Sequence, residues 1–305
     1  MRILIADDDP LTRLLLDNAL TDAGYEVNTA ADGFEAWEAL RRDDAPPLAI
    51  LDWMMPGLAG VDVCRKVRLE GETPYVYIIM LTGRTETRYV VQGMEAGADD
   101  YVSKPFDEQE LQVRVRAGRR IVDLQEALRT QATRDALTAV WNRRAILEVL
   151  QRELSRAARA ADPVGVVMAD VDRFKAINDA HGHLVGDAVL REAARRMSAA
   201  VRPYDALGRY GGEEFLIVLP GCDPAQTLGA AERIRACVSQ APVLTPAGPI
   251  PVTVSLGVAT AFGPGRSVDG LIRLADEALY RAKAGGRNRV GLAAGPEALA
   301  IGPAA

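Results

Sequence analysis

Cysteine, histidine and aromatic residues are scarce in this chain of 305 residues. The three cysteines, Cys64, Cys222 and Cys237, are widely separated and have no Cys-x-x-Cys spacing, and there are only two histidines. An odd number of separated cysteines argues against a disulfide framework, and this spacing is not that of a zinc site. The composition favours a reducing compartment, so we expect a cytoplasmic protein.

The chain also lacks an excess of positive charge and lacks long hydrophobic segments. Its formal net charge of −6 creates no general attraction for nucleic acid or an acidic membrane, so an anionic ligand requires local lysine and arginine. The longest apolar runs, such as 75–81 and 164–169, are far shorter than the roughly 20 residues that span a bilayer. We therefore expect neither nucleic acid nor a membrane as a partner.

Two domains are indicated by the length and by a change of pattern along the chain. With 49% hydrophobic and 26% charged residues, the sequence is typical of soluble globular domains. In residues 1–120, apolar runs at 3–6, 48–51 and 75–81 alternate with amphipathic segments, which predicts an α/β domain with a doubly wound parallel sheet.

The second domain is expected over residues 134–291 and mixes its elements differently. Strands are expected at 163–169, 215–219 and 252–259, and helices at 142–160, 185–201, 224–240 and 268–284. This order predicts an α+β domain around an antiparallel or mixed sheet. Residues 292–305 are rich in alanine, glycine and proline, and we expect them to form a disordered tail.

The segment between the two domains, residues 107–133, contains no proline and only one glycine, which predicts a long helix. Ala117, Ile121, Leu124, Leu128 and Gln131 recur at the spacing of a two-stranded coiled coil. The pattern covers barely two heptads, and packing of this helix on its own domain is nearly as consistent with it. A dimer contact is the interpretation that the chemistry described below favours.

Polar residues follow the expected strands of the first domain. Asp7 and Asp8 come directly after the first strand, and Asp52 follows the 48–51 run. The carboxyl ends of parallel strands meet at one edge of the sheet, where open α/β sheets bind ligands. Clustered carboxylates repel one another unless a cation lies among them, and oxygen ligands suit Mg²⁺. Thr82 and Lys104 lie at two further strand ends, where they are placed to bind a phosphoryl group on Asp52.

In combination, these residues resemble a response-regulator receiver domain over residues 1–120, which is a flavodoxin-like fold. The resemblance implies that Asp52 accepts a phosphoryl group from a cognate histidine kinase or phosphotransfer protein. It implies one Mg²⁺, held by Asp8, Asp52 and the Met54 carbonyl, with Asp7 completing the acidic pair. The remaining implied residues are Thr82 and Lys104, which contact the phosphate, and Tyr101, which changes rotamer on activation.

The second domain contains the run Gly211-Gly212-Glu213-Glu214 between apolar segments. Paired glycines predict a two-residue hairpin turn with positive φ angles, which presents the acids at its tip and lets a phosphate approach the backbone. Asp170 and Asp172 follow another expected strand and are expected on one side of its end, so acids from a strand end and a hairpin tip predict a two-sided metal cage around a nucleotide's phosphates. A plain hairpin with solvated acids is the alternative from this motif alone.

Other residues of this domain are suited to binding the rest of a nucleotide. Lys175, Lys283 and Arg287 are placed to contact phosphates, although by themselves they would be taken for solvated surface charges. Asn178 and Asp187 suit the guanine edge, because a carboxylate accepts from two adjacent donors that adenine does not offer. The two histidines at 181 and 183 lack the partners of a metal site, so we expect them to serve the loop structure.

Together these motifs resemble a GGDEF domain, the diguanylate cyclase family, which has an α+β fold like that of nucleotide cyclases and the polymerase palm. The matching segments occur in the family's order over residues 135–290: 135–138 with 142–144, 170–179, 181–183 with 186–187, 211–215, and 283 with 287. One position departs from the family: Ala139 stands where glycine is common, and we expect a local adjustment of the turn.

The resemblance implies a role for each matching residue. Metal ligands would be Asp170, the Val171 carbonyl, Glu213 and Glu214, with two Mg²⁺ per active site. Glu213 would also be the catalytic base, and Lys175 would stabilise the transition state. The GTP-binding residues would be Asn178, Asp187, Phe174, Gly211, Gly212, Lys283 and Arg287.

Arg202 and Asp205 match the family's RxxD inhibitory site, where the product cyclic di-GMP binds. Arginine can hold a guanine edge or a phosphate with two hydrogen bonds, and the carboxylate can accept from guanine. An ordinary surface ion pair is the alternative, and the fixed offset from the glycines makes us prefer feedback. Arg233 is a weaker candidate for the same ligand.

We therefore expect a diguanylate cyclase that condenses two GTP into cyclic di-GMP as a homodimer and responds to phosphorylation of Asp52. Two alternatives remain from other classes. One is a catalytically silent domain that serves as a receptor for GTP or cyclic di-GMP, and the other is a cyclase that makes a mixed purine dinucleotide. The cognate kinase and the downstream receptor are not encoded in any motif.

Overall fold

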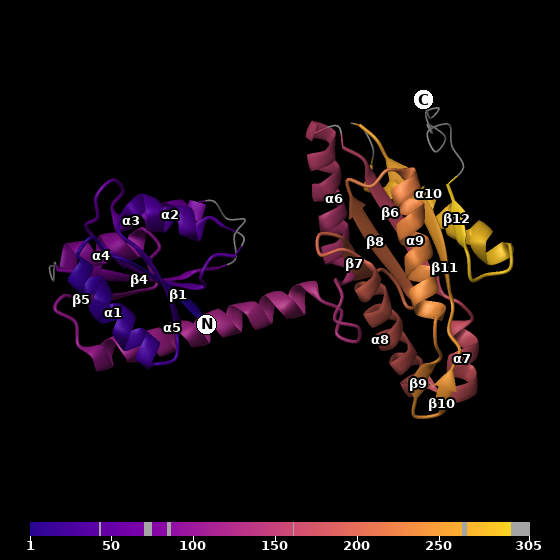
Figure 1. Ribbon diagram of the computed structural model, residues 1–305, viewed down its shortest axis with the longest axis horizontal. Coiled ribbons are helices and arrows are strands. Elements are labelled where there is room, and N and C mark those ends of the chain that lie inside the picture. Colours follow the sequence, from indigo (N-terminus) through magenta and orange to yellow (C-terminus); the bar gives the residue numbers. More distant parts are fainter. Residues whose placement is uncertain (43, 70–74, 84–86, 161, 264–266, 294–305) are drawn as a thin grey trace. The chain divides into compact units, whose positions relative to one another are not determined.

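A computed structural model describes the chain except residues 43, 70–74, 84–86, 161, 264–266 and 294–305. The chain divides into two compact units, Met1–Arg129 and Thr130–Ala305. Each unit is a layered arrangement of a sheet with helices against its faces (Figure 1).

The first unit is a parallel five-stranded sheet in the order β2-β1-β3-β4-β5. Its strands are β1 (Arg2–Ala6), β2 (Glu26–Ala30), β3 (Leu48–Asp52), β4 (Tyr77–Thr82) and β5 (Asp100–Ser103). The first four helices are α1 (Pro10–Asp22), α2 (Gly33–Leu40), α3 (Gly60–Leu69) and α4 (Thr87–Glu95). The doubly wound α/β fold expected from the sequence is confirmed, because strands and helices alternate along the chain and every strand pair is parallel.

The buried residues of this sheet explain why its strands are apolar on both faces. One face packs against α2 and α3 through residues such as Trp37 and Cys64, and the other packs against α1 and α5 through Leu16 and Leu111. Every residue of β3 is buried, which includes its last residue, Asp52. The fold therefore brings an ionisable group to the end of a core strand.

Helix α5 runs over Glu108–Thr133, which confirms the long helix expected at 107–133. Its first part belongs to the core of the first unit, because Leu111 and Val115 are fully buried. Gly118 allows close packing there, since a Cβ at this position would lie 2.5 Å from Cδ1 of Tyr77. Leu124 and Leu128, two positions of the predicted coiled-coil seam, are about 60% exposed.

The second unit contains a five-stranded sheet in the order β12-β11-β6-β8-β7. Its strands are β6 (Val164–Val171), β7 (Ala206–Arg209), β8 (Glu214–Pro220), β11 (Val254–Ala261) and β12 (Val290–Leu292). All pairs are antiparallel except β11 with β12, so the expected antiparallel or mixed sheet is confirmed. A separate hairpin is formed by β9 (Val243–Thr245) and β10 (Gly248–Ile250).

In the described part of this unit, five helices cover the sheet: α6 (Arg143–Ala160), α7 (Phe174–His181), α8 (His183–Ala200), α9 (Pro224–Ser239) and α10 (Val268–Ala284). Helices α7, α8 and α9 pack on one face of the sheet and α6 and α10 on the other. The sequence predicted four of these helices but not α7, which is short and is separated from α8 only by Gly182. The tail predicted at 292–305 lies outside the described residues from 294 onward.

No helix in the described part of either unit is both long enough and apolar enough to cross a membrane.

Candidate functional site

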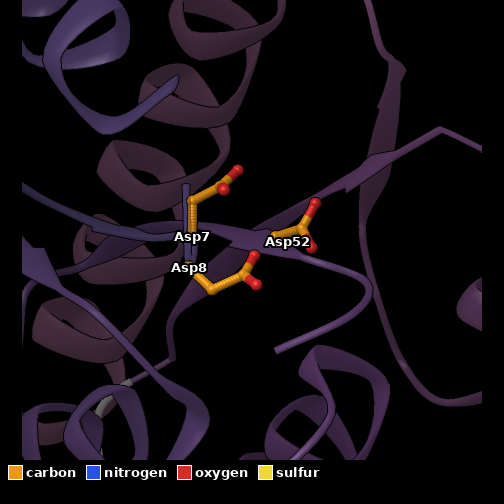
Figure 2. A group of neighbouring side chains, drawn as sticks. All are labelled: Asp7, Asp8 and Asp52. Atoms are coloured by element: carbon orange, nitrogen blue, oxygen red, sulfur yellow. The ribbon is translucent and has the colours of Figure 1, made fainter. Parts of the chain in front are cut away.

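Three carboxylates gather at one edge of the sheet in the first unit. Asp7 and Asp8 directly follow β1, and Asp52 ends the neighbouring strand β3 (Figure 2). One oxygen of each carboxylate lies within 4.8 Å of the others. Within the described residues, this is the one group of three acidic, histidine or cysteine side chains that meets this spacing.

A lysine from the far end of the sheet neutralises part of this charge. Nζ of Lys104 lies 2.6 Å from Oδ2 of Asp7 and also forms an ion pair with Asp52. The backbone N–H of Met54 donates to Oδ2 of Asp52 at 2.8 Å. Burial raises the pKa of Asp52, and the nearby charge of Lys104 opposes the rise. The site therefore holds more buried negative charge than its lysine compensates.

The pocket also has the groups that a phosphoryl acceptor needs. Thr82 ends β4 and is buried, and its carbonyl accepts from the backbone N–H of Lys104 at 2.8 Å, which places the two predicted phosphate contacts side by side. Tyr101 on β5 is 38% exposed, and the guanidinium of Arg114 lies 5.6 Å from its ring centre. Oxygen ligands of this kind fit Mg²⁺. The structure brings the predicted residues together, and their roles remain predictions.

The hairpin of the second unit differs from the turn expected for paired glycines. Strand β7 ends at Arg209 and β8 begins at Glu214, so residues 210–213 form the connection, and neither Gly211 nor Gly212 has a positive φ. The two-residue turn prediction was wrong. A four-residue connection can reverse the chain without left-handed residues, and here the guanidinium of Arg209 closes it by donating to the Gly212 carbonyl at 2.7 Å and 3.0 Å.

Gly211 is required for another reason. A Cβ at this position would lie 2.5 Å from Oε2 of Glu214, whereas a Cβ at Gly212 would meet nothing within 4 Å. The absence of a side chain at Gly211 thus makes room for an acid of the hairpin.

The carboxylates of this hairpin lie beside the end of β6. Asp170 pairs in register with Glu214, and the backbone N–H of Val171 donates to the Glu213 carbonyl at 3.2 Å. Burial raises the pKa of Asp170, of Glu213 and of Glu214, and repulsion from Asp170 raises the two glutamate pKa values further. Nζ of Lys283, from α10, lies 2.7 Å from Oδ2 of Asp170.

This arrangement fits a divalent cation. Burial and mutual repulsion disfavour the ionised form of these carboxylates. A cation bound among them would offset both effects. Within the described residues, their ligand atoms do not all lie within 4.8 Å of one another, unlike those of Asp7, Asp8 and Asp52. Asp170, the Val171 carbonyl, Glu213 and Glu214 supply the oxygen ligands that Mg²⁺ prefers.

The contact between α7 and α8 contains an unsatisfied polar group. Oδ1 of Asn178 is buried and has no hydrogen-bond partner among the residues that the structure describes. It lies against Gly186, where a Cβ would approach it to 1.9 Å, and the half-buried Asp187 follows directly on α8. A buried acceptor without a partner indicates a missing donor. Phe174, at the start of α7, is buried and also lies against Gly186.

The predicted phosphate-binding residues differ in their surroundings. Lys283 is paired with Asp170, whereas Lys175 and Arg287 have no side-chain hydrogen bond or ion pair within the described parts of the chain. His181 ends α7 and His183 begins α8, so the expected loop is a junction of two helices at Gly182, which has φ 82°.

Asp172 has a role that sequence reasoning missed. Its carboxylate accepts from the hydroxyls of Thr253 and Ser255, each at 2.7 Å, and from the backbone N–H of Asn288 at 3.0 Å. The expectation that it faces the metal cage with Asp170 is replaced by a structural role, because these donors use its oxygens. It connects β6, β11 and the segment after α10.

The RxxD residues lie between α8 and β7. The backbone N–H of Arg202 donates to Oδ2 of Asp205 at 2.8 Å, while Oδ1 of Asp205 is buried and finds no hydrogen-bond partner in the described part of the chain. Burial raises the pKa of Asp205. Arg233 reaches from α9 to the Ala200 carbonyl at 2.7 Å, and its charge acts on Asp205. The three predicted residues therefore come together, and ligand binding there remains a prediction.

The turn before α6 contains Ala139, the one position that departs from the family pattern. Ala139 has φ 59°, a left-handed conformation that suits the glycine common at this position. The turn is held by Asp135, which accepts from the backbone N–H and the hydroxyl of Thr138 at 2.9 Å and 2.7 Å and pairs with Arg209 at 3.2 Å.

Two family models match the chain. The model described as "Diguanylate cyclase, GGDEF domain" covers residues 132–289, and "Response regulator receiver domain" covers residues 3–116. The response regulator PleD of Caulobacter vibrioides is 33% identical over 299 residues, which is 95% of this chain and 65% of PleD. The diguanylate cyclase DosC of Escherichia coli is 41% identical over 169 residues, 55% of this chain and 36% of DosC.

Solved structures agree with these matches. The coiled coil and GGDEF domain of DgcB from Caulobacter crescentus, in complex with c-di-GMP, is 33% identical with a TM-score of 0.56, and the match covers 61% of this chain and 98% of that one. This chain spans less than two thirds of the PleD and DosC lengths. With the GGDEF model covering more than half of its residues behind a receiver domain, the chain belongs to the GGDEF family of response regulators.

Proposed function

We propose that this protein is a diguanylate cyclase that condenses two GTP into cyclic di-GMP and releases two pyrophosphates. The observation that carries the proposal is the meeting of the buried Asp170 with the half-buried Glu213 and Glu214 where β6 ends beside the hairpin, with the pKa of each acid raised by burial. A plain hairpin does not require such a set of carboxylates, whereas a metal-dependent phosphoryl transfer does.

The guanine would bind at Asn178 of α7 and Asp187 of α8. The free Oδ1 of Asn178 accepts a hydrogen bond there, and the Asp187 carboxylate accepts from the N1–H and amino group of guanine. The base is thereby fixed while the phosphates of the nucleotide extend towards the end of β6 and the ammonium of Lys175, which has no ion pair among the described residues.

The reaction forms a bond from the ribose 3′-oxygen to the α-phosphate of a second GTP and breaks the bond to pyrophosphate. Bound Mg²⁺ would lower the pKa of the 3′-hydroxyl and neutralise charge on the phosphates. Glu213 would receive the hydroxyl proton, for which burial has already raised its pKa, and Lys175 would stabilise negative charge on the phosphoryl group. Two such transfers close the cyclic product.

Each domain binds one GTP in this scheme, so two chains must face each other. The exposed Leu124 and Leu128 on α5 provide an apolar seam for a parallel second copy. Phosphorylation of Asp52 would change the contacts of Lys104, Thr82 and Tyr101 and shift the population of dimer arrangements. Cyclic di-GMP would bind Arg202, Asp205 and Arg233 and restrain the enzyme.

One incubation distinguishes the proposal from its alternatives. Purified protein with Mg²⁺ and GTP is expected to yield cyclic di-GMP and pyrophosphate, identified by chromatography, and added ATP is not expected to enter the product. GTP that is bound but never consumed would establish a receptor instead. A mixed dinucleotide would overturn the guanine assignment of Asp187. Regulation is tested by an Asp52→Asn variant, which should lose the response to a phosphate mimic.

A further inference from the structure

A hollow of about 390 Å³ opens beside the proposed active site, between the start of α7 and the segment that follows α10. Its lining includes Arg173, Ile177 and His181 on one side and Thr253, Arg287 and Asn288 on the other. Arg173 lies three residues after Asp170, so the hollow is close along the chain to the proposed metal ligands. Only Arg287 of these residues has a role implied by the family resemblance.

Two guanidinium groups line this hollow without partners. Neither Arg173 nor Arg287 makes a side-chain hydrogen bond or an ion pair within the parts of the chain that the structure describes. The chain is acidic overall, with a net charge of −6, and many of its other arginines are paired with carboxylates. Two unpaired guanidiniums in one concave place suit an anion with several oxygens.

The backbone around the hollow is held in an uncommon conformation. Arg173, Arg287 and Asn288 have φ angles of 58°, 62° and 45°, and they are three of the four non-glycine residues with positive φ among the described residues. Left-handed residues other than glycine persist where their surroundings impose them, and they concentrate at functional sites. The hydrogen bond from the Asn288 N–H to buried Asp172 is one such constraint.

The one acidic residue in the lining of the hollow does not exclude an anion. Asp172 is its one acidic lining residue, and its oxygens already accept from Thr253, Ser255 and Asn288. Helix α7 starts at Phe174 without a side-chain cap, so the N–H groups of its first turn add positive potential beside the two arginines.

We propose that Arg173 adds a second guanidinium to the phosphate contact that the family resemblance implies for Arg287, so that it binds the terminal phosphate of the nucleoside triphosphate in this hollow and makes the enzyme select triphosphate over diphosphate. The inference rests on the proposed function, because it takes GTP as the ligand of the adjacent site. The terminal phosphate carries the outermost oxygens of the nucleotide, and a guanidinium can hold two of them at once. A diphosphate would leave Arg173 without its partner.

The test measures binding of a non-hydrolysable GTP analogue and of GDP, each with Mg²⁺, to the full chain by titration calorimetry. Arg173→Ala is expected to weaken binding of the triphosphate by about tenfold or more, the loss of one charge-assisted interaction, and to change GDP binding less than about twofold. Arg173→Lys should retain part of the selectivity, because the charge remains while the paired donors are lost.

Two further variants control for folding and for net charge. Arg173→Gly removes the guanidinium and suits the positive φ, so it should fold and show the same loss as Arg173→Ala. Arg152→Ala removes an equal charge from the exposed surface of α6, away from the hollow, and should leave both affinities unchanged.

Equal losses for GTP analogue and GDP, or no loss for either, would overturn the proposal. Its outcome is separate from that of the proposed function. If the triphosphate is selected through Arg173 while no cyclic di-GMP forms from GTP, the selectivity proposal stands and the cyclase assignment falls. If cyclic di-GMP forms and Arg173→Ala binds both nucleotides as the parent does, the reverse holds.

Discussion

A substitution at Gly211 tests how the hairpin places its acids. A Cβ added there would lie 2.5 Å from Oε2 of Glu214, and an ordinary contact begins at 3.4 Å, so the carboxylate must retreat by about 0.9 Å. The contact is with the far end of a flexible side chain, so the fold should tolerate the change. A displacement of about 1 Å at a reacting site reduces the rate by roughly a hundredfold, or about 2.7 kcal/mol of transition-state stabilisation.

We therefore expect Gly211→Ala to lower Mg²⁺-dependent turnover of GTP by about a hundredfold with a small change in thermal stability. Gly229→Ala is the matched control, because Gly229 lies in α9 with nothing within 4 Å of a new Cβ. It should leave turnover unchanged and stabilise the helix by about 1 kcal/mol.

A double-mutant cycle with Glu214→Ala identifies the cause of the loss. If Gly211 is needed to make room for Glu214, the Gly211→Ala change should have no further effect once that side chain has been removed. If Gly211→Ala lowers turnover by the same factor in both backgrounds, the glycine serves close approach of the nucleotide instead, and the steric argument is refuted.

Three further outcomes are expected. Ala139→Gly should raise the free energy of unfolding by about 1 kcal/mol, because it removes the strain of an alanine in a left-handed conformation. Ala236→Gly, on the exposed side of α9, should lower the free energy of unfolding by a similar amount. Equal thermal stabilities of the two variants would show that Ala139 is not strained. Mg²⁺ at ten times its dissociation constant should stabilise the first unit by about 1.4 kcal/mol, measured by thermal unfolding, and Asp52→Asn should lose this increment; an undiminished increment would place the ion elsewhere. The concentration of Mg²⁺ needed for turnover should rise as the pH falls through the raised pKa of Asp170. Protons then compete with Mg²⁺ for this carboxylate at a higher pH than for an ordinary aspartate, whose pKa is about 4. A Mg²⁺ requirement that stays constant down to pH about 4 would show that the pKa of Asp170 is not raised.

Local patterns in the sequence were enough to predict much of this fold. Apolar runs that end in acids located Asp7 and Asp52 at neighbouring strand ends, since parallel strands finish at the same edge of a sheet. The absence of proline over 107–133 predicted α5 to its last residue, Thr133, and to within one residue of its first. These features depend on residues close together in the chain, so the sequence carries them directly.

Features that depend on distant residues were not predicted. The connection at 210–213 is closed by Arg209, whose own position depends on its ion pair with Asp135, 74 residues away. The carboxylate of Asp172 accepts a hydrogen bond from the hydroxyl of Thr253, which is 81 residues away. Helix α7 was missed because its eight residues give too short an apolar pattern, and its end at Gly182 depends on a left-handed glycine. The alternation of Thr253 and Ser255 beside β6 could have indicated donors for a buried carboxylate.

The central claim is that acids from the end of β6 and from the β7–β8 connection act together in the conversion of GTP. Its most direct test is the rate of cyclic di-GMP formation by Asp170→Asn and Glu213→Gln variants whose folding is verified by thermal unfolding. The account predicts that each rate is at least about a hundredfold below that of the parent. Turnover as fast as the parent's in both folded variants would contradict it.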